Sequence, residues 1–298
     1  MTTTTPRTPR PVDHLVLPTV KLETARQRLE ALGFTVALSA QHPFGTENAC
    51  VFFSDNTYLE PLAIAQRETC ETEARNGNVF VARDQAYRFR NGQEGFSAFV
   101  MGTEDAKADH ESFVASGISA GKMLEFSRPF ALPDGTQDIA SFRLAFAADL
   151  RAPDAFFFTV QRVNTPNVDR TKLQTHKNGV TGLRELVLSE INPTDFQYPL
   201  QEVINQRDVN AHSFGMDLRA ANANITVLTP AGLRSFFGMD APESERGLRL
   251  QAFVLGVSDL AAVETLLANN NISTEKRGSR LIVHKAPGQG AAIVFEAS

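Results

Sequence analysis

The sequence predicts an α+β fold built from four βαβββ units that pair into two curved sheets. Residues 12–64 read as one strand, one helix and three further strands, and the same order recurs three more times along the 298 residues. A unit of this size cannot cover both faces of its own sheet, so each unit needs a partner unit. The four units account for almost the whole chain.

In the first unit, residues 12–65, the apolar run VDHLVL predicts the first strand. Gly33 then ends a predicted helix, because glycine can take the left-handed conformation found at helix ends. The runs FTVAL, ACVFF and TYLEPLAI predict three more strands, separated by turn-forming residues. The helix itself is indicated by four apolar residues at offsets 0, 3, 7 and 10, which share one face: Leu22, Ala25, Leu29 and Leu32.

The second unit, residues 94–163, repeats this order. FSAFVMG predicts a strand, Glu104 to Ser116 a helix ended by Gly117, and ISAGKMLEF, ASFRLAFA and AFFFTVQRV three strands. The loop LPDGT, residues 132–136, carries an Asp-Gly turn signal. Residues 164–180 lack apolar periodicity, which predicts a crossover linker between two halves.

The second half, residues 181–298, contains the units 181–240 and 246–298. The third unit opens with LRELVLSEI and continues with a helical stretch over 194–205 and the strand ANITVLTP. A short helix follows, with Thr229 as its cap, Pro230 in its first turn and Gly238 at its end. In the fourth unit LRLQAFVLGV, a helix capped by Ser258, SRLIVHK and AAIVFEAS complete the pattern.

Composition narrows the class of protein. Apolar residues make up 42% and charged residues 21% of the chain, which is typical of a packed globular protein. The net charge is −5 and no basic block is present, which argues against nucleic acid as a partner. No apolar run approaches the roughly 18–20 residues that cross a bilayer, so no membrane partner is expected.

Residues 1–11 lack the apolar segment of a secretory signal and are predicted to be a flexible tail, which makes a cytoplasmic location the default expectation. Cys50 and Cys70 have no metal or redox spacing.

Four segments of the first unit resemble the vicinal oxygen chelate superfamily of glyoxalases, bleomycin-resistance proteins and extradiol dioxygenases, and within it the glyoxalase-like domain proteins. They are DHLVL with His14, the helix end LEALGF, the loop HPFGTEN, and YLEPLAI with Glu60. The resemblance implies that the four units pair into two glyoxalase-like half-barrel sheets. In that superfamily the first strand supplies a His or Gln metal ligand and the last strand a Glu, and His14 and Glu60 fall on those positions.

The resemblance also extends the ligand set, although the pairing of units stays open. Aligning the fourth unit on the first puts Gln251 at the His14 position and Glu296 at the Glu60 position. If units one and four share a sheet, these four residues resemble the ligands of glyoxalase I and would hold Zn, Ni, Mn or Fe. If units one and two share a sheet, the last strand of unit two offers Gln161 and no carboxylate, and the site is incomplete.

Each site residue has an ordinary structural alternative. His14 could be a core histidine, whereas Glu60, in a very apolar run, would cost several kcal/mol if it were buried without a partner. The loop HPFGTEN could be a simple hairpin turn, but the family pattern implies that it lines the cavity. Gln161 and His176 resemble cavity segments of the same family, and could instead be a strand-end and a turn residue. The implied substrate contacts are therefore His42, Thr46, Asn48, Gln161 and His176.

The leading functional hypothesis is a metal-dependent enzyme of lyase or isomerase type that acts on a small oxygenated metabolite. The ion would bind two adjacent substrate oxygens and stabilise an enolate, and Glu60 or Glu296 would serve as general base. One alternative is a metal-free protein that sequesters a small molecule, as bleomycin-resistance relatives do, in a cavity lined by some of the 22 Phe. Others are an extradiol-type dioxygenase, which lacks a clear second His here, and a scaffold whose second half serves only packing. The chain is expected to be a monomer or a homodimer.

Overall fold

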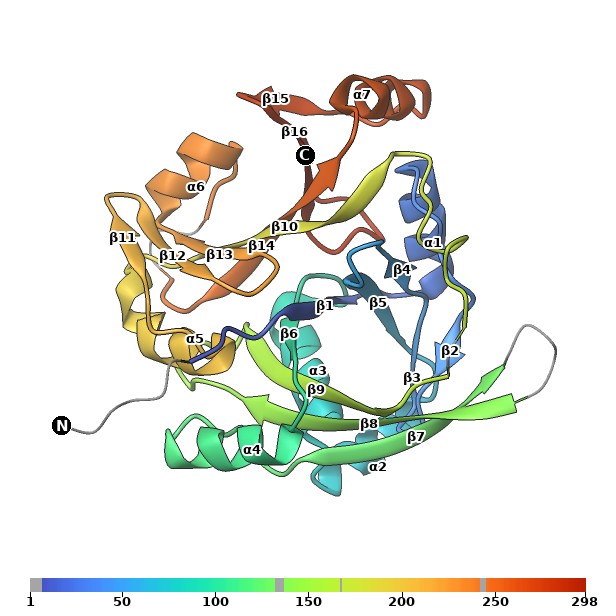
Figure 1. Cartoon of the computed structure of the whole chain (residues 1–298), viewed down its shortest axis with the longest axis vertical. Helices are drawn as coiled ribbons and strands as arrows, with labels where there is room; N and C mark the ends of the chain where they lie inside the picture. The colour runs from blue at the N-terminus through green and yellow to red at the C-terminus, as the bar shows by residue number, and fades with distance from the viewer. Residues whose placement is uncertain (1–6, 132–136, 167, 242–244) are drawn as a thin grey trace.

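The computed structural model describes residues 7–131, 137–166, 168–241 and 245–298, and within them two mixed sheets with helices around them confirm the predicted α+β fold (Figure 1). The first sheet contains β1 (Val12–Pro18), β2 (Ala40–Gln41), β3 (Thr46–Asn48), β4 (Val51–Phe52), β5 (Tyr58–Ile64), β6 (Ala98–Gly102), β7 (Leu124–Ala131), β8 (Gln137–Ala147) and β9 (Phe156–Asn164). The second contains β10 (Val180–Ser189), β11 (Asn210–His212), β12 (Gly215–Arg219), β13 (Asn224–Leu228), β14 (Arg249–Val257), β15 (Glu275–Arg277), β16 (Arg280–Val283) and β17 (Ala292–Ala297). The helices are α1 (Leu22–Ala31), α2 (Arg67–Arg75), α3 (Val79–Asn91), α4 (Ala106–Ala115), α5 (Gln197–Ile204), α6 (Pro230–Phe237) and α7 (Leu260–Asn269).

The strand order shows which units pair. The first sheet runs β2-β3-β5-β1-β6-β9-β8-β7, with β4 beside β5, and the second runs β11-β12-β13-β10-β14-β17-β16-β15. At the centre of each sheet the first strands of two consecutive units meet in antiparallel pairing, β1 with β6 and β10 with β14. Units one and two therefore share the first sheet, and units three and four share the second.

The two faces of the first sheet have different surroundings, because side chains alternate along a strand. Leu15 and Phe99 point to one face and join a core that also contains Leu186 and Phe253 of the second sheet. Val16 lies on the opposite face, in a separate apolar cluster. His14, two residues before Val16, shares this second face, which is turned away from the core common to the two halves.

Several predicted elements are confirmed at their ends. Gly33 has a φ of 90° after α1, and Gly238 has a φ of 64° after α6. Thr229 Oγ1 accepts a hydrogen bond from the Gly232 amide, 3.1 Å away, as expected for the cap of α6. Helix α7 differs in its cap, because Asp259 Oδ1 accepts from the Ala262 amide at 3.0 Å, and Ser258 lies one residue too early to do so.

The prediction of a strand at FTVAL was wrong, for an identifiable reason. Arg26 of α1 donates to the carbonyl oxygens of Val36, at 3.1 Å, and Ala37, at 2.7 Å, so its guanidinium satisfies groups that a neighbouring strand would otherwise bind. The elements that were not predicted are the helices α2 and α3 between the first two units and the short strands β2, β3, β11, β12 and β15. The loop at 132–136 lies outside the described residues.

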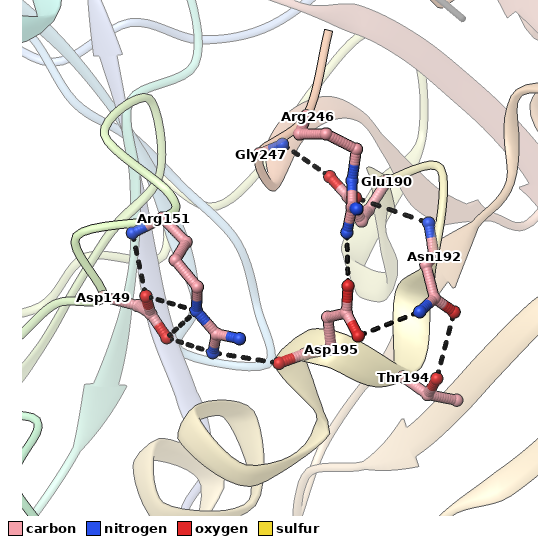
Figure 2. Close-up of polar contacts among 8 residues, drawn as sticks. All are labelled: Asp149, Arg151, Glu190, Asn192, Thr194, Asp195, Arg246 and Gly247. Atoms are coloured by element: carbon pink, nitrogen blue, oxygen red, sulfur yellow. Dashed lines mark hydrogen bonds and ion pairs between the residues drawn. The ribbon is translucent and has the colours of Figure 1, made fainter. Parts of the chain in front are cut away.

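A polar network joins the two halves (Figure 2). Arg151, held by Asp149, donates from Nη2 to the backbone oxygen of Asp195 in the second half, at 3.0 Å. Arg246 binds the side chains of Asp195 and Glu190, and the buried Glu190 carboxylate also accepts from the Gly247 amide at 2.6 Å. Charged groups are thus satisfied on both sides of this junction.

The start of the described chain also contacts the second half. Arg7 forms an ion pair with Glu202 at 3.0 Å, and Arg10 donates to the Val203 carbonyl oxygen at 2.9 Å. The predicted tail is therefore held against α5 over residues 7–11, and residues 1–6 lie outside the described part. In the described residues, the helices are all too short or too polar to cross a membrane.

The buried Arg88 of α3 should be one of the most stabilising polar residues of the first half. Its guanidinium donates to Asp84 at 2.8 Å and to the carbonyl oxygens of Thr19, at 3.1 Å, and Leu62, at 2.9 Å, which ties the helix to the ends of β1 and β5. We expect Arg88→Met to lower the free energy of unfolding by about 3–5 kcal/mol, because it leaves the Asp84 carboxylate buried without its partner. Chemical denaturation measures this loss.

The matched control is Arg67→Met, which removes an exposed pair with Glu71 within α2. Its expected cost is below about 0.5 kcal/mol, as is usual for exposed pairs one helical turn apart. Equal losses in the two variants would contradict the structural role given to Arg88.

Candidate functional site

A cavity of about 100 Å³ lies on the second face of the first sheet. Its apolar wall is mostly aromatic and includes Phe44, Phe80, Phe126, Phe142 and Phe158. Its polar lining includes His14, His42, Asn48, Tyr58, Glu60, Arg128, Arg162 and Arg170. An apolar cavity with a few convergent polar groups is typical of a small-molecule site.

Glu60 is the point on which the polar side chains of the cavity converge. Strands β1 and β5 run parallel, with Val16 opposite Glu60, so the Glu60 carboxylate lies on the same face as His14. Asn48 Nδ2 donates to Glu60 Oε1 at 2.7 Å, and His14 Nε2 lies 3.4 Å from Oε2. His42 Nε2 lies 3.8 Å from Oε1. The structure therefore brings together four of the predicted site residues.

These neighbours keep Glu60 ionised although only 5% of the residue is exposed. Burial alone would raise the pKa of the carboxyl group. The hydrogen bond and charge of His14, the charge of His42 and the hydrogen bond from Asn48 outweigh it and lower the pKa of Glu60 to about 2. The protein thus stabilises a carboxylate in an apolar strand, and these partners offset the cost of burying Glu60.

His14 lies between two carboxylates. Its Nδ1 donates to Asp13 Oδ1 at 2.7 Å, and its ring stacks on Tyr58 with the centroids 4.4 Å apart. Asp13 is in turn paired with Arg162, whose Nη2 lies 2.9 Å from Oδ1. Burial disfavours the imidazolium, but the hydrogen bonds to Asp13 and Glu60 outweigh burial and raise the pKa of His14.

His42 is held as a neutral ring. Asn48 Nδ2 lies 3.3 Å from its Nε2, so this nitrogen must accept, and Nδ1 then donates to Thr46 Oγ1 at 2.8 Å. Burial, together with the charges of Arg128 and His14, lowers the pKa of His42 to about 4 against the opposing effect of Glu60. Thr46 lies behind the ring and orients it.

Three predicted substrate contacts lie outside the cavity lining: Thr46, which is bound to the His42 ring, Gln161 and His176. Gln161 donates to the Glu104 carbonyl oxygen at 2.7 Å and accepts from the Ala106 amide at 3.3 Å, at the start of α4. His176 accepts from the Thr35 amide at 3.0 Å and its Nε2 lies 2.9 Å from the Phe52 carbonyl oxygen. The side chains of Gln161 and His176 bind backbone groups, so their observed positions match the ordinary structural alternatives.

Gln251 and Glu296 belong to the second sheet and are not brought to His14 and Glu60. Gln251 donates to Ser189 Oγ at 2.7 Å. Glu296 accepts from Arg280 Nε at 3.2 Å, and Arg280 Nη2 also binds Glu185 at 2.6 Å. Glu185 holds in the third unit the place of His14 in the first, so in the second half an arginine occupies the space between the two corresponding positions.

Four contributors to the site were not predicted: Asp13, Arg128, Arg162 and Arg170. Asp13 is adjacent to His14 in the sequence, which is a signal for a residue that orients a histidine. The three arginines come from β7, β9 and the crossover linker, and no spacing in the sequence links them. Only the curvature of the sheet, which brings β7 over β5, places them at one cavity.

The donor set does not complete a metal site. Across the described ranges, no group of three or more His, Cys, Asp or Glu side chains is arranged to hold a metal ion. His14 and Glu60 are two donors of suitable type, but both ring nitrogens of His14 face carboxylates, and both Glu60 oxygens already have polar neighbours.

Solved structures with low sequence identity share the fold. A hypothetical protein from Staphylococcus aureus matches with a TM-score of 0.66 at 12% identity, covering 96% of this chain and 99% of its own. A mutant of 4-hydroxymandelate synthase from Streptomyces coelicolor matches with a TM-score of 0.62 at 12% identity, covering 97% and 93%. The Mn(II)-bound glyoxalase from Novosphingobium aromaticivorans matches with a TM-score of 0.53 at 10% identity, covering 98% and 83%.

Sequence comparison identifies the family. None of the curated proteins compared matches this sequence. The model of the glyoxalase-like domain matches residues 12–204, which include the whole first sheet and the cavity with Glu60. The chain therefore belongs to the glyoxalase-like domain family, within the vicinal oxygen chelate superfamily.

Proposed function

We propose that the cavity of the first sheet binds a small oxygenated metabolite and catalyses proton transfer at His14 and Glu60, as a lyase or isomerase does. The observation that supports this most is the convergence of His14, Asn48 and His42 on one buried carboxylate at an aromatic cavity. Such an arrangement costs stability in a core and is concentrated at functional sites.

The geometry supplies an acid and a base in one pair. As an imidazolium, which its raised pKa favours, His14 donates from Nδ1 to Asp13 and can donate from Nε2 to a substrate oxygen on which negative charge develops. At 3.4 Å its contact with Glu60 is long, so a substrate oxygen can compete for it. Glu60 then loses a hydrogen-bond donor, its pKa rises, and it becomes a stronger base toward an acidic C–H group of the bound substrate.

The second candidate is a metal-free protein that sequesters its ligand. It is favoured by the fact that both Glu60 oxygens already have polar partners within the protein. In that case the cavity needs only shape and hydrogen bonding, and the bound molecule leaves unchanged.

Hydrogen exchange separates the two candidates. We expect the protein, incubated in D₂O with small hydroxy- and oxo-substituted carbonyl compounds, to exchange the C–H next to the carbonyl of at least one compound, as followed by NMR. Glu60→Gln should slow this exchange about 100-fold or more, the usual contribution of a general base. Glu47→Gln is the control, because Glu47 lies on β3 between Thr46 and Asn48 but does not line the cavity.

The outcomes are distinct. Binding without exchange, seen as a shift in melting temperature, would favour sequestration over catalysis. Exchange that is equal in the wild type and in Glu60→Gln would remove Glu60 as the base. A panel in which no compound binds would contradict the proposal as a whole.

Metal content tests the donor set separately. We expect elemental analysis of untagged protein to find Zn, Ni, Mn and Fe well below one equivalent, because no group of three or more donors among the described residues is arranged to hold an ion. A full equivalent that is lost in His14→Ala would overturn this expectation and favour the metal-dependent mechanism. One of the similar solved structures is a Mn(II)-bound glyoxalase.

The neutral His42 of this site should give a pH-dependent stability. Its pKa of about 4 in the folded protein lies below the ordinary 6.5, so between these values the unfolded chain binds more protons. Acidification through this window therefore favours unfolding, by about 3 kcal/mol at most from His42 alone. We expect His42→Gln to lose this part of the pH dependence in denaturation curves measured from pH 6.5 to 4. Parallel curves for the variant and the wild type would show that His42 is not buried in its neutral form.

A further inference from the structure

We infer that the ligand of this cavity is a small carboxylate with an aromatic body, and that Arg128 binds its carboxylate group. This inference deepens the proposed function and rests on it, because it names the class of molecule that occupies the same cavity. Three independent features of the described residues support it.

The first feature is an arginine with two buried nitrogens that have no partner among the described residues. Arg128 follows Phe126 by two residues on β7, so both side chains lie on the cavity face of the sheet. Its Nε and Nη1 are buried, and none of the described residues accepts a hydrogen bond from them. Leaving charged donors unsatisfied away from water is costly, and an anion bound in the cavity would remove that cost.

The second feature is the distribution of charge around the cavity. The two acidic groups at its base are already engaged, Asp13 by Arg162 and His14, and Glu60 by His14 and Asn48. Neither carboxylate is therefore available to Arg128. Cationic groups at the cavity outnumber the anionic groups that could balance them.

Arg170 adds to this excess. Its guanidinium lies over the Phe52 ring, 4.9 Å from the centroid, and it lines the same cavity. Burial and the charges of Arg162 and Arg128 lower the pKa of Arg170. Like charges gathered at one cavity favour an anionic ligand.

The third feature is the aromatic wall of the same cavity. Phe126 and Phe142 stack with centroids 5.2 Å apart, and Phe158 packs edge-on against the His14 ring at 5.8 Å. An aromatic ring fits such a wall by offset or edge-to-face packing. A planar carboxylate on that ring can reach a guanidinium while the oxygenated carbon is directed to His14 and Glu60.

Isothermal titration with matched probes tests the inference. The probes are benzoate, phenylacetate and 3-phenylpropanoate, the corresponding neutral amides, and acetate. We expect the wild type to bind at least one aromatic carboxylate at least about tenfold more tightly than its amide, and more tightly than acetate. Phenyl phosphate is included, and tighter binding of it than of all three carboxylates would overturn the assignment of a carboxylate.

Variants identify the residue responsible. In Arg128→Met the preference for acid over amide should fall to less than about threefold, and Arg128→Lys should retain part of it. The control is Arg143→Met, which removes one positive charge from the neighbouring strand β8, on the face that does not line the cavity. It should keep the full preference. A preference that survives in Arg128→Met, or that is lost equally in Arg143→Met, would overturn the role of Arg128.

Two further readouts keep the test decisive. Because no described residue accepts from the buried Nε and Nη1 of Arg128, Arg128→Met should melt at the wild-type temperature or above it, so a lost preference cannot be ascribed to unfolding. Equal binding of acids and amides by the wild type would overturn the anionic ligand and leave the proposed function standing. Binding of no probe at millimolar concentration would count against both.

Discussion

The antiparallel pairing of β1 with β6 is the constraint on which the rest of the site depends. It joins two consecutive units through their first strands, and it gives the sheet one face that packs on the second half and one that curves around a cavity. Because successive side chains of a strand point to opposite faces of the sheet, Leu15 lies in the shared core and His14 lines the cavity. The parallel pairing of β5 with β1 then carries Glu60 to the same face.

The two halves of the chain share the same sheet order but carry different polar residues at the corresponding positions. In the first sheet, polar residues from β1, β3 and β5 leave a cavity between them. In the second, Arg280 extends between Glu185 and Glu296, at 2.6 and 3.2 Å, and its guanidinium packs over Phe237, so the corresponding space contains an internal ion pair. A cavity of about 210 Å³ lies beside this ion pair and is lined by Glu185, Phe237 and Arg280. The second half also covers the inner face of the first sheet, through residues such as Phe253.

Sequence patterns could predict most of this fold, because helix ends and alternation are local. Gly33, Thr229 and Gly238 have the conformations or hydrogen bonds that their residue types predict. FTVAL is different, because its carbonyl groups are bound by Arg26 from the preceding helix, a contact that alternation does not encode. The pairing of units also depends on tertiary contacts, and the sequence alone left it open.

The same distinction applies to the site. His14, His42, Asn48 and Glu60 were predictable because all four lie in one unit with a recognisable pattern. Gln251 and Glu296 were placed by analogy between units, which cannot tell whether two units share a sheet. The arginines had no local signal at all, since β7, β9 and the linker contribute one each and only the curved sheet collects them.

The balance of charges connects the stability of this half with its function. Arg88 shows how the chain treats a buried cation that serves only structure: a carboxylate and backbone carbonyl oxygens surround its guanidinium. The charged groups at the base of the cavity also have partners, because Asp13, His14, Glu60 and Arg162 bind one another. Arg128 differs from them, with buried nitrogens that no described residue binds. Two buried donors on one arginine, which no described residue accepts from, are a cost in stability that a ligand bound at the cavity can offset, and this cost is a physical reason to regard the cavity as a binding site.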